Sequence, residues 1–367
     1  MQKRGFFLTH SPIEVHFAQN SKDFVVEEVP LYTASGAGDH LFVKVRKKGV
    51  STWEMISDLS ERLGVKVRDV GYAGLKDKQA MAIQTISLPA KYEQALAHFD
   101  HSNIKILETA RHNNKLKMGH LKGNKFFIRL KKVRSSDALK LGEALKAIGE
   151  FGMPNFFGFQ RFGRDGDNYK TARAFLDGDT KIRGKKMQTF LINALQSERF
   201  NAWLTKRLDI SHLIGGFKPN EIAKELGLDT KTVQTLKEQT HPFKLLEGDL
   251  LCHYPHGKLF NAEDLTAESK RFSDKQISPT GLLSGYRSAH SSGYAFKIEE
   301  QYFEDIPASG DRRYAWVFPE VESGRFVEEE GHYELSFYLP KGSYATALIE
   351  ELTHDELRAV REQEAQS

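Results

Sequence analysis

Strand-like runs lie near both ends of the chain. Residues 24–29 and 41–46 have strand character, and the glycines of the segment between them suit a turn, so these two runs predict a hairpin. Residues 125–133 and 333–339 alternate apolar and polar positions with the period of two that is typical of a strand with one buried face. The pattern therefore predicts a sheet to which both ends of the chain contribute.

Helical spacing of apolar residues separates these strands. Ser51 and Glu54 form a capping box, the apolar positions after them repeat at helical spacing, and Gly64 ends that helix. A second helix is predicted over residues 138–148, before the Gly-Met-Pro sequence at 152–154 interrupts it.

The middle of the chain has a different hydrophobic pattern, because helical periodicity dominates between residues 181 and 311. With 367 residues the chain exceeds what one hydrophobic core usually serves, so two domains are expected. Strands on both sides of a helical middle predict that residues 181–311 are inserted into a sheet-based domain made of residues 1–180 and 312–367.

Positive charge is concentrated in one segment. The formal net charge is only +4, but residues 105–134 contain ten Lys and Arg residues against one acid, Glu108. Such a segment indicates a surface that faces phosphates, and with aromatic residues throughout the chain it favours an enzyme that acts on nucleic acid. The alternative is a solvated strand and loop with ordinary lysines.

Several classes of protein are disfavoured. The single cysteine, Cys252, excludes an internal disulfide and a multi-cysteine zinc site, and the nearby His253 and His256 lack a fourth ligand, so no metal is expected. Dinucleotide-binding, Walker and nucleophile-elbow motifs are missing, so the chemistries that depend on them are set aside. No run reaches about 18 apolar residues and residues 1–17 lack a signal-peptide core, so a cytoplasmic location fits best.

A glycine-rich turn, Gly71-Tyr-Ala-Gly-Leu-Lys-Asp77-Lys, presents one carboxylate between two lysines. Flanking cations favour the ionised form, which suits a nucleophile or an ion-pair partner better than a proton donor. Strand character on both sides places Asp77 on a loop held by sheet edges, where catalytic groups are common. The alternative is a turn aspartate that only accepts hydrogen bonds or caps the turn.

Aromatic residues, glycines and arginines are interleaved over residues 155–169, with neither helical nor strand periodicity. Asn155 and Phe157 in this segment are candidates to hold an extruded base, through an amide hydrogen bond and a stacking face. Phe337 on the last strand is a candidate for a second stacking face. The alternative for all three is a place in an aromatic core.

These segments together resemble a known family. Gly74-Leu-Lys-Asp-Lys-Gln-Ala80, Pro154-Asn-Phe-Phe-Gly-Phe-Gln-Arg-Phe-Gly163 and Phe337-Tyr-Leu-Pro-Lys-Gly-Ser-Tyr-Ala-Thr346 are similar, in order and spacing, to motifs of the TruD family of pseudouridine synthases. Supporting matches are Asp23-Phe-Val-Val-Glu27, Arg111-His-Asn-Asn-Lys-Leu-Lys-Met-Gly119, Leu121-Lys-Gly-Asn124 and Leu195-Gln-Ser-Glu-Arg-Phe-Asn201. The resemblance is weaker from about residue 210 to 283.

The resemblance implies an α+β fold, in which a catalytic domain with a mixed, largely antiparallel sheet carries an inserted α/β (TRUD) domain. It implies conversion of uridine to pseudouridine at position 13 in the D arm of tRNA, without a cofactor or metal. Asp77 matches the catalytic aspartate; attack on C1′, attack on C6 and abstraction of a 2′ proton all stay open. Phe24, Asn155 and Phe337 match uridine-binding positions, and Phe157 lies close to them.

The basic segment supplies the expected contacts to RNA phosphates, namely Arg111, Lys115, Lys117 and Lys122. tRNA is the expected partner, with no membrane and no obligatory protein partner. Two alternatives remain, a pseudouridine synthase for another RNA and a non-catalytic RNA-binding or RNA-folding protein. The departures from the family motifs are minor, with Gln79 where histidine is common and Phe159 at a variable place.

Overall fold

The computed structural model describes residues 4–163 and 165–357. Its contacts divide the chain into two compact units. The Asp77 unit consists of Glu14–Leu145 and Pro319–Gly342, and the Asn155 unit consists of Met1–Ile13, Lys146–Phe318 and Ser343–Ser367. These divisions fall at other residues than the expected boundaries near 180 and 312, so the inserted domain at 181–311 stays a prediction.

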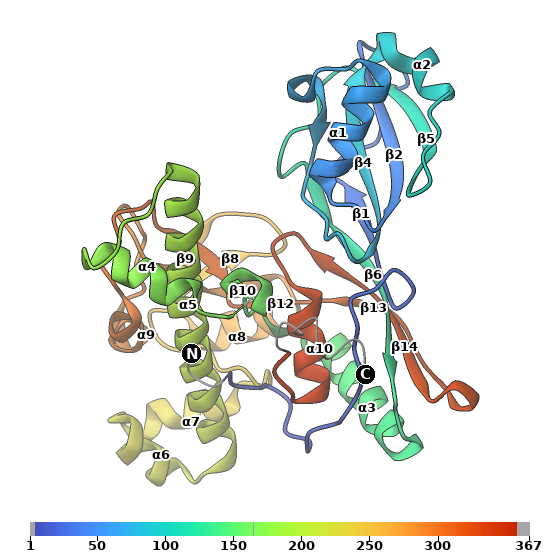
Figure 1. Cartoon of the computed structure of the whole chain (residues 1–367). Helices are drawn as coiled ribbons and strands as arrows, with labels where there is room; N and C mark the ends of the chain where they lie inside the picture. The colour runs from blue at the N-terminus through green and yellow to red at the C-terminus, as the bar shows by residue number, and fades with distance from the viewer. Residues whose placement is uncertain (1–3, 164, 358–367) are drawn as a thin grey trace. The chain divides into compact units, whose positions relative to one another are not determined.

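The Asp77 unit is built around one sheet, drawn from blue to cyan in Figure 1 with its last two strands in red. Its elements are β1 (Phe24–Pro30), β2 (His40–Lys48), α1 (Thr52–Leu63), β3 (Gly71–Tyr72), β4 (Met81–Pro89), α2 (Glu93–Ala97), β5 (Ile104–His112), β6 (Leu121–Lys131), β13 (Glu320–Val327), β14 (His332–Pro340) and α3 (Ser135–Phe151), which crosses the division at Leu145.

The strands follow the order β13-β14-β6-β1-β4-β2-β5, and β3 pairs with β4. Only β1 and β4 are parallel, so the sheet is mixed and largely antiparallel, as expected. The predicted hairpin of residues 24–29 and 41–46 is wrong, because β4 lies between β1 and β2. The local pattern predicted the two strands but contained nothing about a later strand that separates them.

One row of paired positions crosses five neighbouring strands. The row consists of Lys47 on β2, Ala82 on β4, Val26 on β1, Phe126 on β6 and Phe337 on β14. Paired residues of adjacent strands point to the same face of a sheet. The side chains of this row therefore lie on one face, which we call the row face.

Helix α1 covers part of the row face. Met55, Ile56 and Leu59 of α1 belong to the same buried cluster as Val43 and Val45 of β2. The helix begins with the expected capping box of Ser51 and Glu54, and Gly64 ends it in the left-handed conformation that favours glycine. Because the first turn of α1 is fixed in this way, it is a firm support for the segment that follows β3.

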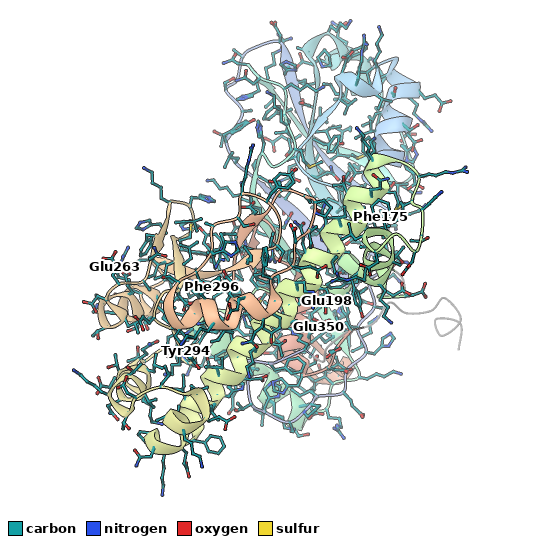
Figure 2. The ribbon with its side chains drawn as sticks, turned by 90° about the vertical axis from the view of Figure 1, so that its left-hand side faces the viewer. Phe175, Glu198, Glu263, Tyr294, Phe296 and Glu350 are labelled. Atoms are coloured by element: carbon teal, nitrogen blue, oxygen red, sulfur yellow. The ribbon has the colours of Figure 1, made fainter. Side chains whose placement is uncertain are left out.

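The Asn155 unit combines helices with two small sheets. Its elements are β7 (Met153–Pro154), α4 (Asn168–Leu176), α5 (Lys185–Gly216), α6 (Pro219–Leu226), α7 (Thr230–Glu238), β8 (Leu250–His253), β9 (Leu259–Asn261), α8 (Leu265–Ser273), β10 (Ile277–Leu283), α9 (Gly293–Glu299), β11 (Asp311–Tyr314), β12 (Trp316–Val317) and α10 (Ala345–Thr353). Figure 2 shows α5 running the length of this unit, with Glu198 on α5 and Phe175 on the adjacent α4.

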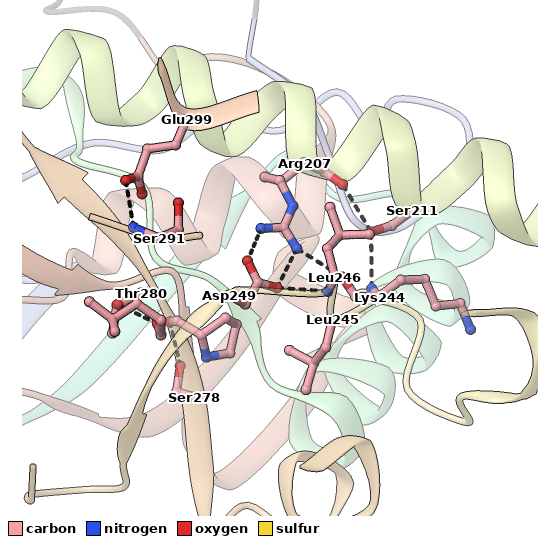
Figure 3. A network of polar contacts seen from close by, with 12 residues as sticks. Arg207, Ser211, Lys244, Leu245, Leu246, Asp249, Ser278, Thr280, Ser291 and Glu299 are labelled. Carbon is pink, nitrogen blue, oxygen red and sulfur yellow. Dashed lines mark hydrogen bonds and ion pairs between the residues drawn. The ribbon is translucent and has the colours of Figure 1, made fainter. Parts of the chain in front are cut away.

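A buried ion pair fixes α5 against the segment that leads into β8 (Figure 3). The guanidinium of Arg207 donates two hydrogen bonds to the carboxylate of Asp249, at 2.6 and 2.9 Å, and both side chains are almost fully buried. Nearby, Arg312 of β11 donates a 2.5 Å hydrogen bond to Glu299 and another to the carbonyl of Thr280. In each pair the opposite charges offset the cost of burial, and removal of one partner would leave the other charge uncompensated.

The α+β class predicted from the sequence is confirmed, with helices beside mixed and antiparallel sheets. Among the residues that the structure describes, no helix is both long enough and apolar enough to cross a bilayer.

Candidate active site

The loop that carries Asp77 connects β3 with β4, and a buried lysine holds its main chain. Lys47, fully buried on the row face, donates hydrogen bonds from Nζ to the carbonyl oxygens of Val50 at 2.8 Å, Lys76 at 3.1 Å and Asp77 at 2.8 Å. All three N–H groups of one ammonium are therefore used on backbone carbonyls. They fix the chain at Asp77 itself.

The two residues beside Asp77 are held by their own partners. The ammonium of Lys76 lies 2.7 Å from the carboxylate of Glu28 on β1, and the exposed Lys78 lies 2.6 Å from Glu54 of α1. The hydroxyl of Thr52 accepts a 2.9 Å hydrogen bond from the backbone N–H of Lys76. Both flanking lysines thus pair with other acids and are not direct partners of the Asp77 carboxylate.

The carboxylate of Asp77 itself is free of hydrogen bonds from the described residues 4–163 and 165–357, and the residue is exposed. Desolvation nevertheless raises the pKa of Asp77, and the positive charges of Lys47 and Lys76 oppose this effect without reversing it. The direction is opposite to the one expected from flanking cations alone. Burial also lowers the pKa of Lys47 to about 8, although the charge of Asp77 counteracts it.

Three phenylalanines lie side by side on the row face. The rings of Phe126 and Phe337 are stacked, with centroids 5.4 Å apart, and the ring of Phe24 lies 6.0 Å from that of Phe126. Two predicted site residues, Phe24 and Phe337, thus lie on either side of Phe126, on the same face of the sheet as Lys47, which holds Asp77. Both are buried, at 3% and 0% exposure, so packing is a substantial part of what they do.

The side chain of Asn155 in the Asn155 unit is held at both ends of its amide. Its Nδ2 donates a 3.0 Å hydrogen bond to the carbonyl of Tyr314, and its Oδ1 accepts a 2.9 Å hydrogen bond from Arg313. Arg313 also donates to the backbone carbonyl of Asn155, at 3.0 and 3.2 Å. One N–H and one lone pair of the amide remain for a ligand.

Phe157 does not present a free ring face. The guanidinium of Arg313 lies 3.9 Å from its ring centroid, Phe200 and Tyr344 contact it edge-on, and the ring is 7% exposed. The pKa of Arg313 is lowered to about 10, mainly by burial; Tyr344 opposes this effect, and the positive charge of Arg161 adds to it. The predicted contact of Phe157 with substrate stays a prediction, but its observed contact is with the residue that orients Asn155.

The predicted phosphate contacts lie on β5, on β6 and on the loop between them. Arg111 pairs with Glu93 at 2.6 Å, and the ammonium of Lys115 donates to the carbonyl of Arg68. Lys117 and Lys122 are exposed. Arg111 would therefore have to leave or share its acid in order to bind a phosphate.

Sequence reasoning missed the two residues that orient the site, Lys47 and Arg313. A signal for Lys47 was present, because it continues the alternation of Val43 and Val45 and so falls on the buried face. No comparable signal marked Arg313, which lies beside a second arginine at an expected domain boundary.

The cysteine and histidine segment gives no metal centre. Within the described part of the chain, no group of three or more His, Cys, Asp or Glu side chains could hold a metal ion. The thiol of Cys252 is buried near the carbonyl of Gly257 and the hydroxyl of Tyr314. The expectation of metal-free chemistry stays a prediction.

Known proteins are similar to this chain over almost its whole length. The sequence profile of the family described as tRNA pseudouridine synthase D (TruD) matches residues 1–182 and 182–352. A protein of a Nitratiruptor species named tRNA pseudouridine synthase D is 52% identical over 356 residues, covering 97% of this chain and 99% of the relative. A protein of the same name from Wolinella succinogenes is 49% identical over 358 residues, with the same coverage.

A solved structure supports the fold. A crystal structure described as a tRNA pseudouridine synthase D (TruD) from Methanosarcina mazei is similar with a TM-score of 0.66 at 20% identity, covering 96% of each chain. At that identity the likeness concerns the fold, whereas the profile and the sequence relatives determine the family. The chain belongs to the tRNA pseudouridine synthase D (TruD) family of isomerases.

Proposed function

We propose that this protein converts uridine 13 in the D arm of tRNA to pseudouridine, with Asp77 as the catalytic carboxylate and with no metal or cofactor. The observation that carries the proposal is a carboxylate that accepts no hydrogen bond from the described residues, on a loop whose main chain is fixed by Lys47. A carboxylate that must add to carbon or remove a proton needs free lone pairs and a fixed position close to the reacting atom. The names of the sequence relatives and the family motifs support the same assignment.

The reaction is an isomerisation and needs no second reactant. The bond between N1 and C1′ breaks, the uracil turns within the site, and C5 forms the new bond to C1′. The hydrogen of C5 then leaves to solvent as a proton, and N1 takes up a proton in its place. Attack of Asp77 on C1′, attack on C6 and removal of a 2′ proton each begin from the ionised carboxylate. The charges of Lys47 and Lys76 favour that ionised form against desolvation.

The target uridine has to leave its stack before this chemistry, at a cost of a few kcal/mol. The proposed uridine contacts are Phe24, Asn155, Phe157 and Phe337. The amide of Asn155 retains one donor and one acceptor, which suits the edge of uracil, a ring that alternates C=O and N–H groups.

The rest of the tRNA is proposed to bind through phosphate contacts of Arg111, Lys115, Lys117 and Lys122 in the cytoplasm. Exposed lysines at 117 and 122 support this assignment. Neutralising all four should flatten the salt dependence of tRNA binding, by somewhat less than one unit of log slope for each phosphate that is no longer neutralised.

Tritium release tests the function directly. A tRNA transcript labelled with 5-tritiated uridine should lose one equivalent of tritium to water, and a transcript with cytidine at position 13 should lose none. Release from the cytidine-13 transcript would place the reaction at another uridine. No release from either transcript, with tRNA still bound, would favour a non-catalytic RNA-binding protein.

A further inference from the structure

An exposed tryptophan lies beside the Asp77 loop and has no role in the proposed chemistry. Trp53, the second residue of α1, is 53% exposed, whereas Trp203 and Trp316 are 3% and 0% exposed. A single exposed apolar side chain is common, but a group of them rimmed by polar residues is a mark of a binding surface.

The residues that flank Trp53 contact the residues that flank Asp77. Thr52, just before Trp53, accepts the backbone hydrogen bond of Lys76, just before Asp77, at 2.9 Å. Glu54, just after Trp53, pairs with Lys78, just after Asp77, at 2.6 Å. The indole therefore belongs to the first turn of α1, whose residues on both sides of Trp53 contact the residues on both sides of Asp77.

Other exposed apolar side chains lie on the neighbouring segments. Leu75 of the Asp77 loop is 55% exposed, and Met118 is 59% exposed on the loop that donates from the N–H of Gly119 to the carbonyl of Ala73 at 2.8 Å. The ring of Tyr72 meets the indole edge-on, with centroids 5.4 Å apart, and so supports its orientation. We call Trp53, Tyr72, Leu75 and Met118 the indole surface.

Cations accompany the indole surface. Lys78 is 57% exposed at its side chain and pairs with Glu54, Lys117 precedes Met118, and Arg68 is exposed four residues before Tyr72. Flat apolar faces set among lysines and arginines match a single-stranded nucleic acid, in which unstacked bases alternate with phosphates.

We propose that Trp53 stacks on an unpaired nucleobase of the bound tRNA that neighbours the extruded uridine. The inference rests on the proposed function for the identity of the RNA. Its consequence is that the RNA is gripped immediately beside the reacting nucleotide, through a contact that requires a flat ring but no particular base.

Fluorescence reports this contact directly, because Trp53 is the exposed member of the three tryptophans in the chain. Titration of the full-length protein with unmodified tRNA transcript should quench the Trp53 component. Trp53→Phe should bind like the parent protein and lose the quenching. Trp53→Leu, which keeps apolar bulk against Tyr72 but lacks a stacking face, should raise the KM for tRNA about 5- to 140-fold, with kcat within about twofold.

Leu139→Ala is the matched control, since Leu139 is 74% exposed on α3 of the same unit; it should change neither constant. The inference is overturned if Trp53→Leu leaves KM unchanged, if kcat falls while KM does not, or if tRNA causes no quenching. These results are separable from failure of the proposed function, which would appear as absent tritium release from position 13 in the parent protein.

Discussion

The Asp77 loop and the Asn155 segment are held in opposite ways. At Asp77 the protein fixes the main chain, through the ammonium of Lys47, and leaves the carboxylate free of hydrogen bonds from the described residues. At Asn155 it fixes the side chain, with Arg313 on the amide oxygen and the carbonyl of Tyr314 on the amide nitrogen. A cation supplies hydrogen bonds in each case, but only the amide of Asn155 receives one at its functional group, whereas the carboxylate of Asp77 receives none from the described residues.

The difference follows from what each group is proposed to do. A carboxylate that reacts must keep its lone pairs, and its two oxygens are equivalent, so only its position has to be fixed. An amide that reads the edge of a base has two different ends of almost the same shape, so its orientation has to be fixed as well. Substitution of Lys47, which holds the main chain at Asp77, should therefore lower kcat. Substitution of Arg313, which holds the side chain of Asn155, should lower kcat/KM.

The largest effect is expected at Asp77. Asp77→Asn keeps the shape of the side chain and removes its ability to act as a nucleophile or base, so isomerisation should be abolished in a single-turnover assay. The affinity for tRNA should stay within a few-fold, because no described residue donates a hydrogen bond to the carboxylate that the substitution could remove. Asp69→Asn, in the turn before β3, is the control; near-normal turnover by Asp77→Asn would remove Asp77 from its proposed role.

The next largest effect is expected from loosening the Asp77 loop. Lys47→Met should lower kcat by roughly 10- to 100-fold with little change in tRNA affinity, because displacement of a reacting group by about 1 Å has an effect of this size. Lys44→Met is the matched control, since Lys44 is on the same strand, faces the other side of the sheet and is 37% exposed. Equal effects of the two substitutions would show that Lys47 contributes charge to the sheet and does not place Asp77.

The pH dependence of turnover also tests whether the ammonium of Lys47 holds the Asp77 loop. The pKa of Lys47 is about 8, and above that pH the neutral amine has two N–H groups for three carbonyl oxygens. The kcat of the parent protein should therefore fall as pH rises through about 8, and this fall should be absent in Lys47→Met.

Unfolding would not account for that fall. Between the folded pKa of about 8 and the ordinary value of 10.5, the unfolded chain binds the Lys47 proton more tightly than the folded chain does. The contribution of Lys47 to the free energy of unfolding therefore rises with pH in this window. Denaturant melts below and above the pKa of Lys47 separate loss of activity from loss of fold; a drop in stability that matches the drop in turnover would contradict the explanation.

A smaller effect is expected at the Asn155 segment. Arg313→Lys keeps a positive charge but loses the planar fork that binds the backbone and side-chain oxygens of Asn155, so kcat/KM should fall about tenfold. Asn155→Ala in the Arg313→Lys background should add little, because both changes remove the same oriented amide. Arg161→Met, which removes the other cation near the Phe157 ring, is the control. Full additivity would mean that Arg313 acts independently of Asn155.

Local patterns predicted much of the fold and less of the site. Alternation and capping predicted β1, β2, β6, β14 and α1, because each depends on neighbours in the sequence. The pairing of β1 with β4 was not predictable in this way, since the energy comes from a sheet assembled over long separations. For the same reason the division into two units did not follow the change from strand to helix patterns.

The motifs predicted which residues matter but not how they are held. Lys47 belongs to a Lys-Lys-Gly sequence that suggests an exposed turn, whereas its alternation with Val43 and Val45 places it on the buried face, so two local signals conflict. Arg313 contacts a residue far away in the chain, and no local signal encodes that distance. Phe337 was equally compatible with stacking and with the core, and its complete burial beside Phe126 shows packing while its contact with uridine stays a prediction.

The position of β14 has a consequence for synthesis of the protein on the ribosome. β14 pairs with β6 over the whole of its length, so β6 is an unprotected edge until β14 emerges. The two strands end at Lys131 and Pro340, a separation of 340 − 131 = 209 residues. At about 5–20 residues per second, the nascent chain exposes that edge for roughly 10–40 s, and an unpaired strand edge is prone to aggregation during this time.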